Sequence, residues 1–505
     1  MTAIAALSGP LPRLGVVAVA LLAAWAMLAR GERSRATAML GALVLSPVLL
    51  LVDIWHSPQL HLVHRHPLYA VLGAAVVLGL LGAAAVALHR RPWLVAALSV
   101  AALPFRVPIE AGGQTSNLLV PLYLVLAAAA LAIIVPAFRS EAPDEEGPGA
   151  GWIARLLALY VVLYAIQATY SSDFEKALQN EVFFYVPFAL LFVLLGRIVW
   201  DRALVVRCLQ IVVGLALLFA CIGFVEYATK TIILNPKLVV QNDLHTYFVV
   251  NSVFFDPDIF GRFLALVIIV LASMLVYGRA RREQLLACGA MVVLWACLLL
   301  TLSRTSLLAL LVGIGALIAV RFARWRTVVA GGAAIVALGI VAVAISPTTF
   351  GLNQGLNGVS SGRGSLLSGG VRLFADRPLW GFGSGSFETA YHAHNPNAGS
   401  LTASHTIPVT IAAEQGLIGE LAYLALVITG IVTLLRGARG DPVRAAIGAA
   451  FLALVFHTML YADFLEDPFT WTLLGIGVVL ARNAPAPAPE PRRARAAAGP
   501  LPASA

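Results

Sequence analysis

The chain is built from apolar runs of about 17–25 residues, and each run is long enough for one helix to cross the hydrocarbon core of a membrane. These runs explain why 60% of the residues are hydrophobic and only 12% are charged, whereas soluble domains carry about 25% charged residues. A spanning β-barrel would instead show short strands of alternating polarity. The pattern therefore predicts an all-α polytopic membrane protein.

We expect about 12–15 transmembrane helices, because that many runs approach spanning length. The run 93–105 is short for a crossing and is interrupted near its end by Pro104, which a helix interior tolerates poorly. The candidate spans are 14–29, 37–54, 68–88, 93–105, 117–137, 152–169, 183–199, 203–225, 259–277, 285–302, 305–320, 327–345, 417–435, 445–462 and 469–481.

Short arginine-rich turns separate several of these spans. Cytoplasmic loops of membrane proteins are enriched in Lys and Arg, so we expect these turns to face the cytoplasm. The candidate spans place all of them on one side of the membrane. They also account for the net charge of +9 without nucleic acid as a partner. The turns are Arg30–Arg35, His89–Arg91, Gly278–Arg282, Arg321–Arg326 and Arg436–Arg439.

The longest polar interval of the chain runs from Ser360 to Leu424. It contains Trp380 and a Gly-Phe-Gly-Ser-Gly segment, and a disordered linker seldom has so apolar a composition. A polar interval of this length in a compact protein is often functional. Leu367, Val371 and Phe374 follow helical spacing within it, which predicts an amphipathic helix beginning at Arg363 that either lies on the outer membrane surface or caps a cavity.

The spans and the polar interval predict four parts of the chain. Residues 1–345 form N-terminal transmembrane helices, and residues 346–416 form one large extracytoplasmic loop with the amphipathic helix. Residues 417–483 form the C-terminal transmembrane helices. Residues 484–505 are rich in Pro, Ala and Arg, which predicts a disordered cytoplasmic tail.

Four arginines are candidates for binding an anion. Arg304 lies in a very short turn between two spans, where an arginine is usually paired or functional, although it could also extend to lipid headgroups. Arg363, Arg372 and Arg377 lie in the polar interval. They could attract anionic lipid, or they could clamp a phosphate group through bidentate, pH-independent pairing.

We predict no metal site. His392, His394 and His405 could be drawn as a zinc site, but the Pro, Asn and Gly residues among them do not specify a rigid ligand geometry. Asp256 and Asp258 form a D-x-D pattern, which occurs in some metal-dependent glycosyltransferases. A turn before the next span explains this pattern equally well.

Other titratable side chains lie inside the apolar runs. His457 is a functional candidate because of that position, and a helix–helix hydrogen bond is an equal possibility. The cysteines lack metal-ligand spacing and are interpreted as small hydrophobic residues. They are Cys208, Cys221, Cys288 and Cys297.

Three segments resemble motifs of the O-antigen ligase/polymerase superfamily. The turn Ser303–Ser306, followed by an apolar helix, is similar to the Ser-Arg turn of that family. The segments Ser361–Arg363 and Ala375–Gly385 resemble its loop helix and its Pro-Leu-x-Gly-x-Gly motif. His405, followed by Glu414–Gly419, resembles its His…Glu-x-Gly-Leu-x-Gly motif. The order of these segments adds to the resemblance.

The resemblance implies a GT-C-like helical bundle in the bacterial inner membrane, with its site facing the periplasm. It implies a metal-independent glycosyltransferase, without a cofactor, that moves a glycan from undecaprenyl diphosphate to an acceptor glycan or lipid-glycan. His405 would be the catalytic base, and Arg304 and Arg363 would bind the diphosphate. Secondary candidates are Arg372, Arg377, Glu414 and His394.

Three alternatives to an O-antigen ligase follow from the same sequence. A polymerase of the same superfamily shares these motifs and differs in its acceptor. A lipid-glycan flippase or transporter would carry polar residues through its span interiors, which are poor in them here. A non-catalytic assembly scaffold would not need a histidine and two arginines on one side of the membrane.

Overall fold

A computed structural model describes residues 9–54, 65–111, 114–139, 149–233, 242, 248–278, 280–327, 329–333, 363–396 and 404–483. This part of the chain is almost entirely helical, apart from an antiparallel hairpin of β1 (Val107–Ala111) and β2 (Gln114–Leu118). The helices of the first half are α2 (Pro10–Leu28), α3 (Glu32–Ile54), α5 (Pro67–Arg90), α6 (Trp93–Ala102), α7 (Val120–Arg139), α8 (Trp152–Ala168), α9 (Phe174–Asn180), the π-helix η2 (Glu181–Tyr185), α10 (Val186–Gly196) and α11 (Arg202–Thr229). Those of the second half are α13 (Pro257–Tyr277), α14 (Arg281–Leu300), α15 (Arg304–Phe322), α18 (Arg363–Asp376), α19 (Phe387–His394), α20 (Ile407–Leu435), α21 (Pro442–Thr458) and α22 (Pro468–Arg482).

The lengths and compositions of these helices confirm the predicted class, an all-α polytopic membrane protein. In the described part of the chain, 10 helices are long and apolar enough to cross a membrane. Four shorter apolar helices are α6, α8, α21 and α22. The candidate span 327–345 lies mostly outside the described residues.

Helix α20 begins at Ile407, earlier than the predicted span 417–435, with Pro408 in its first turn. Pro is tolerated there because the first turn needs no intrahelical N–H donor. The backbone leaves helical geometry at Gly416 and then continues as helix to Leu435. The end of the predicted loop is therefore one more helical segment, joined to the span through a kink.

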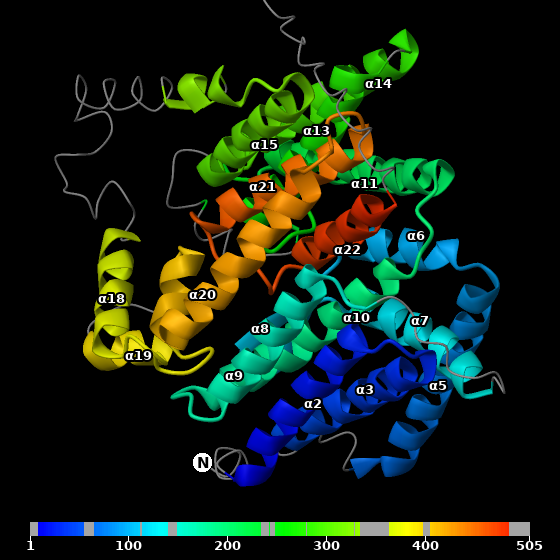
Figure 1. The fold of residues 1–505 in the computed structure, drawn as a ribbon, viewed down its shortest axis with the longest axis vertical. Coiled ribbons are helices and arrows are strands. Elements are labelled where there is room, and N and C mark those ends of the chain that lie inside the picture. Colours follow the sequence, from blue (N-terminus) through cyan, green and yellow to red (C-terminus); the bar gives the residue numbers. More distant parts are fainter. Residues whose placement is uncertain are drawn as a thin grey trace, which may run out of the picture.

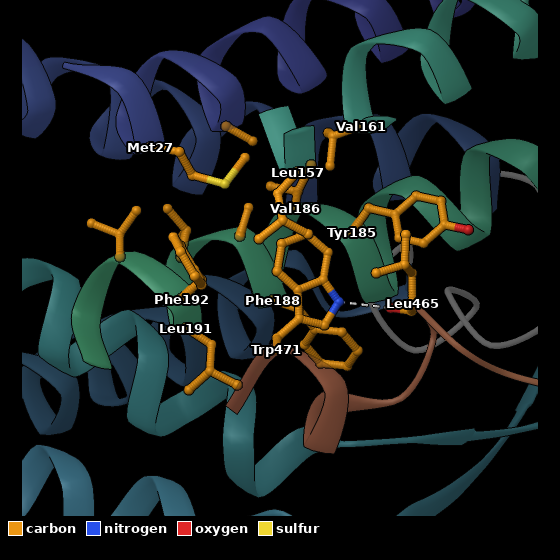
Figure 2. Close-up of a cluster of buried hydrophobic side chains, with 14 of the residues drawn as sticks. Met27, Leu157, Val161, Tyr185, Val186, Phe188, Leu191, Phe192, Leu465 and Trp471 are labelled. Atoms are coloured by element: carbon orange, nitrogen blue, oxygen red, sulfur yellow. Dashed lines mark hydrogen bonds between the residues drawn. The ribbon is translucent and has the colours of Figure 1, made fainter. Parts of the chain in front are cut away.

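The first of two large cores lies around α10. Trp471 of α22 is fully buried there, and Figure 2 shows it beside Phe188 and Val186 of α10. Its indole nitrogen donates a hydrogen bond to the carbonyl of Leu465 at 2.8 Å. A buried Trp needs such a partner, because an unpaired N–H is costly away from water.

Helix α21 is shared between the two cores. Ile447, Phe451 and Val455 belong to the core that includes Trp471. Ala449 and Ala453 belong to the second core, with residues of α11, α13, α14 and α15. Small residues allow the backbones of neighbouring helices to approach closely, and α21 gives the second core these alanines together with Leu454. Figure 1 shows α21 between α15 and α20.

Two contacts bring the ends of separate helices together. Glu32, in the arginine-rich turn before α3, pairs with Arg197 at 2.6 Å, so this turn lies beside the turn that follows α10. The starts of α13 and α15 meet through hydrogen bonds from Thr305 and Ser303 to Asp258.

Candidate functional site

The Ser-Arg turn before α15 is held by hydroxyl groups. Ser303 caps the helix by accepting the N–H of Ser306 at 3.2 Å, as short polar residues do at helix N-termini. The hydroxyls of Ser303 and Thr305 both donate to the Asp258 carboxylate, the latter at 2.9 Å. Arg304 is exposed, and no carboxylate of the described residues pairs with it. The turn is therefore fixed while its cation stays open to a ligand.

The two aspartates of the D-x-D pattern serve the helix ends. Asp256 caps α13 by accepting the N–H groups of Asp258 at 2.7 Å and Ile259 at 3.3 Å. Burial, and then the neighbouring Asp258, raise the pKa of Asp256. In the described ranges, no group of three or more His, Cys, Asp or Glu residues could hold a metal ion. The structure thus supports the turn interpretation of this pattern.

His405 lies two residues before α20 in an unusual backbone conformation. Its φ of 56° is in the left-handed region, which non-glycine residues seldom adopt. Ser404 stabilises the turn, since its hydroxyl donates to the carbonyl of Thr406 at 2.8 Å and accepts the N–H of Thr406 at 3.1 Å. The half-buried imidazole lies 6.1 Å from the ring of Tyr461, centroid to centroid. Strained residues of this kind often occur at functional sites.

Two side chains link His405 to the Ser-Arg turn. The Nε2 atom of buried His457 lies 3.2 Å from the hydroxyl oxygen of Ser306. The His457 ring lies 5.5 Å from the Tyr461 ring, which in turn contacts His405. For His457, the predicted helix–helix hydrogen bond is observed, between α21 and α15. Neither Tyr461 nor its role was predicted from the sequence.

Glu414 accepts backbone hydrogen bonds in and next to the motif loop, which we define as residues 378–386. Its carboxylate accepts the N–H of Gly385 at 2.9 Å and the N–H of Phe387 at 3.0 Å. Its own carbonyl accepts the N–H of Gly383 at 2.8 Å. Two N–H donors and burial at 8% exposure leave this carboxylate little access to a substrate.

The glycines of the motif loop and of α20 allow two backbones to touch. Gly416, with φ 65°, lies against the loop so closely that a Cβ atom there would be 2.7 Å from the Trp380 nitrogen. Gly381, with φ 68°, lies equally close to the chain at Gln415. The N–H of Leu417 donates to the carbonyl of Pro378 at 2.8 Å. Only glycine combines a positive φ with this approach.

Helix α8 and the residues that follow it also form hydrogen bonds with the motif loop and with the kink of α20. The side-chain amide of Gln167 donates to the carbonyl of Gln415 at 3.0 Å, which satisfies the backbone at the kink. The hydroxyl of Ser171 donates to the carbonyl of Ser384 at 2.8 Å. These polar residues were not predicted, because only the tertiary fold brings them to the motif loop.

The remaining arginines of the polar interval are accessible. Arg372 is exposed on α18. Arg377 lies 4.5 Å above the ring of Phe382 and lines an open, mostly apolar cavity of about 590 Å³ with Trp380 and Tyr170. Its guanidinium is thus held by a cation–π contact beside a groove with an apolar wall.

His394 is held within the loop. Its Nε2 atom lies 3.4 Å from the Asp376 carboxylate, and its Nδ1 atom lies 2.8 Å from the carbonyl oxygen of Ala390. Both ring nitrogens therefore have partners on α18 and α19.

Helix α18 begins at Arg363 as predicted, but the side chain of Arg363 lies outside the described residues. The buried face of α18 carries Leu366 and Leu373, and Figure 1 shows the helix beside α19 and the start of α20. Leu367 and Val371 of the predicted apolar face are 43% and 52% exposed, as they would be on a helix that lies on the outer membrane surface. On the protein side, α18 packs closely against Tyr391 and Val409 at the two glycines 369 and 370.

One protein-family model matches the part of the chain that contains this site. The family model described as O-antigen ligase matches residues 289–424. This segment contains the Ser-Arg turn, α18, the motif loop, His405 and the kink at Gly416. A search of curated proteins gives no match.

Proposed function

We propose that this protein transfers a glycan from a polyprenyl diphosphate to an acceptor hydroxyl. The match of residues 289–424 to the O-antigen ligase family model supports its membership of the O-antigen ligase/polymerase superfamily of membrane proteins. The proposal depends on one observation above all. Arg304 and His405 are far apart in sequence, yet His457 and Tyr461 link the Ser306 hydroxyl, two residues after Arg304, to the His405 ring. The turn that carries the accessible Arg304 and the His405 imidazole thus border one polar cluster.

Each of the two groups has a role in the transfer. The acceptor oxygen attacks the anomeric carbon of the donor, and the bond from that carbon to the diphosphate oxygen breaks. His405 accepts the proton of the acceptor hydroxyl, a role that suits an imidazole near neutral pH. Arg304 and Arg363 bind the diphosphate and stabilise the charge that develops as it leaves, so the reaction needs no metal ion.

The secondary candidates divide into two groups under this proposal. Glu414 and His394 hold the loop, because their polar atoms are engaged by backbone groups and by Asp376. Arg372 and Arg377 are accessible and lie on the loop side of the site, where they attract anionic headgroups.

The site faces the periplasm under this proposal, and the protein resides in the bacterial inner membrane. The arginine-rich turns support this orientation. Ser368 is exposed on α18, so Ser368→Cys, in a chain whose native cysteines are replaced, should react with a membrane-impermeant thiol reagent in intact spheroplasts. Reaction only after lysis would reverse the orientation.

The direct test uses purified protein in lipid nanodiscs with a polyprenyl-diphosphate glycan and a lipid-linked acceptor. His405→Ala should lower turnover by about 10²–10⁴-fold while donor binding survives, because general-base catalysis contributes that much. Arg304→Ala should weaken donor binding, and Lys at that position should restore it poorly because Lys lacks the planar fork. Arg372→Ala is the matched control on the same side. Near wild-type turnover of His405→Ala, or loss of activity in EDTA with recovery on adding a divalent ion, would overturn the mechanism.

The product separates a ligase from a polymerase. In a strain that lacks the protein, loss of a ligase leaves lipid-linked polymer unattached, whereas loss of a polymerase leaves single repeat units. Both outcomes fit the same donor chemistry and differ in the acceptor.

A further inference from the structure

Tyr461 occupies the centre of the polar cluster, between the two histidines. It lies in the segment between α21 and α22, beyond the matched residues 289–424. Its ring centroid is 6.1 Å from that of His405 and 5.5 Å from that of His457, with tilted ring planes in both cases. The tyrosine therefore contacts the proposed base from outside the segment that carries the motifs.

Other elements hold the tyrosine in place. Its hydroxyl lies near the carboxyl of Asp256, the cap of α13, and each group influences the pKa of the other. The guanidinium of Arg262 lies 6.0 Å from the ring centroid. Arg262 is itself fixed by a buried ion pair with Asp467 at 2.5 Å, so the support behind the ring consists of buried, charged groups on α13 and at the start of α22.

His405 needs support of this kind. It precedes α20 and so lies outside regular helix, and its φ of 56° is unfavourable for a residue with a Cβ atom. A residue keeps such a conformation only where its surroundings impose it. The Ser404 turn fixes the backbone, and the Tyr461 ring contacts the imidazole itself.

We propose that Tyr461 is a positioning residue that holds the His405 imidazole next to the Ser-Arg turn, an inference that rests on the proposed function of His405. The ring acts on His405, and the hydroxyl anchors the ring to Asp256. The tyrosine thereby sets the distance between the base and the arginine that binds the leaving group. This distance matters because a misplacement of about 1 Å can cost about 10²-fold in rate.

Three variants separate these contributions. Tyr461→Leu removes the ring and should lower kcat by about 10²-fold, with the KM for the donor within about threefold of wild type, because binding of the diphosphate is unaffected. Tyr461→Phe keeps the ring and loses only its anchor, so it should lower kcat by less than about tenfold. The matched control is Tyr227→Leu, which also removes a tyrosine ring that contacts a cation, Lys230, and another ring, that of Phe248.

Two further measurements exclude a merely structural role. The rate at which diethyl pyrocarbonate modifies His405, followed by mass spectrometry of its peptide, should change in Tyr461→Leu and stay unchanged in Tyr227→Leu. In a His405→Ala background, Tyr461→Leu should cause no further loss of turnover, because residues that act as a unit are not additive. If Tyr461→Leu does not fold, Tyr461→Met, which fills more of the space, takes its place with the same expected values.

The proposal is overturned if Tyr461→Leu turns over within about twofold of wild type, if the modification rate of His405 is unchanged, or if the two substitutions are additive. These failures differ from a failure of the proposed function. If His405→Ala itself turns over like wild type, the catalytic assignment is wrong, whereas a changed modification rate of His405 in Tyr461→Leu would still support the positioning contact.

Discussion

Replacing Glu414 tests whether this residue serves the fold or the chemistry. Its carboxylate accepts two backbone N–H groups, from Gly385 at 2.9 Å and from Phe387 at 3.0 Å. Glu414→Ala would leave both donors buried without a partner. Each unsatisfied buried donor costs about 1–3 kcal/mol, so the free energy of unfolding should fall by about 2–6 kcal/mol. Glu414→Gln keeps one acceptor oxygen and should lose about half of that amount.

The assay is thermal and denaturant-induced unfolding of the purified variants in one detergent, with turnover measured on the same preparations. Glu388→Ala is the control, since Glu388 lies in the same region and is only half-buried. The motif loop should also become more accessible to protease in Glu414→Ala. A Glu414→Ala protein as stable as wild type to within about 0.5 kcal/mol, but without turnover, would refute the structural role and return Glu414 to the catalytic candidates.

Three more predictions follow from the described geometry. Gly416→Ala should destabilise the protein by at least about 1–2 kcal/mol, because φ is +65° and a Cβ atom would meet the motif loop. The control is Gly79→Ala on exposed α5, where a Cβ atom meets nothing within 4 Å, so this variant should be neutral or slightly stabilising in the same melting assay. Glu181→Met should raise the free energy of unfolding by about 1–3 kcal/mol, since both carboxyl oxygens of Glu181 are buried without a hydrogen-bond partner in the described part of the chain. An unchanged or lower melting temperature would show that the site holds a partner for the carboxyl. Burial raises the pKa of Glu466, so its contribution to stability is present below its ordinary pKa and is lost as the pH rises through the raised value. Glu466→Gln should therefore gain in melting temperature relative to wild type as the pH rises above about 4, and a constant difference would contradict this.

The sequence predicts the spans well because hydropathy and length are local properties. Helices α3, α5, α7 and α11 all coincide with candidate runs. The candidate span 417–435 begins later than α20, because Gly416 indicates a helix boundary when only local sequence is considered. In the fold, Pro408 occupies a first turn and Gly416 forms a kink that the motif loop stabilises.

The candidate site is partly visible in the sequence for the same reason. The Ser-Arg turn and His405 lie in short, recognisable patterns. Tyr461 does not, because its contacts with His405 and Asp256 join residues that are distant in the chain. The roles of Glu414 and Asp258 were also hidden, since a carboxylate that accepts N–H or O–H groups of the protein has the same sequence signature as a catalytic one.

The hydrogen bond from Gln167 to Gln415 has a consequence for biosynthesis. The two residues are 248 positions apart, and a ribosome that adds about 5–20 residues per second needs about 12–50 s to cover that distance. Until α20 is inserted, the Gln167 amide lies in a membrane helix without its final acceptor, and unsatisfied polar groups are costly there. A nascent or truncated chain thus presents an exposed amide that a finished chain conceals, a chemical difference by which a membrane protease or insertase could recognise incomplete copies.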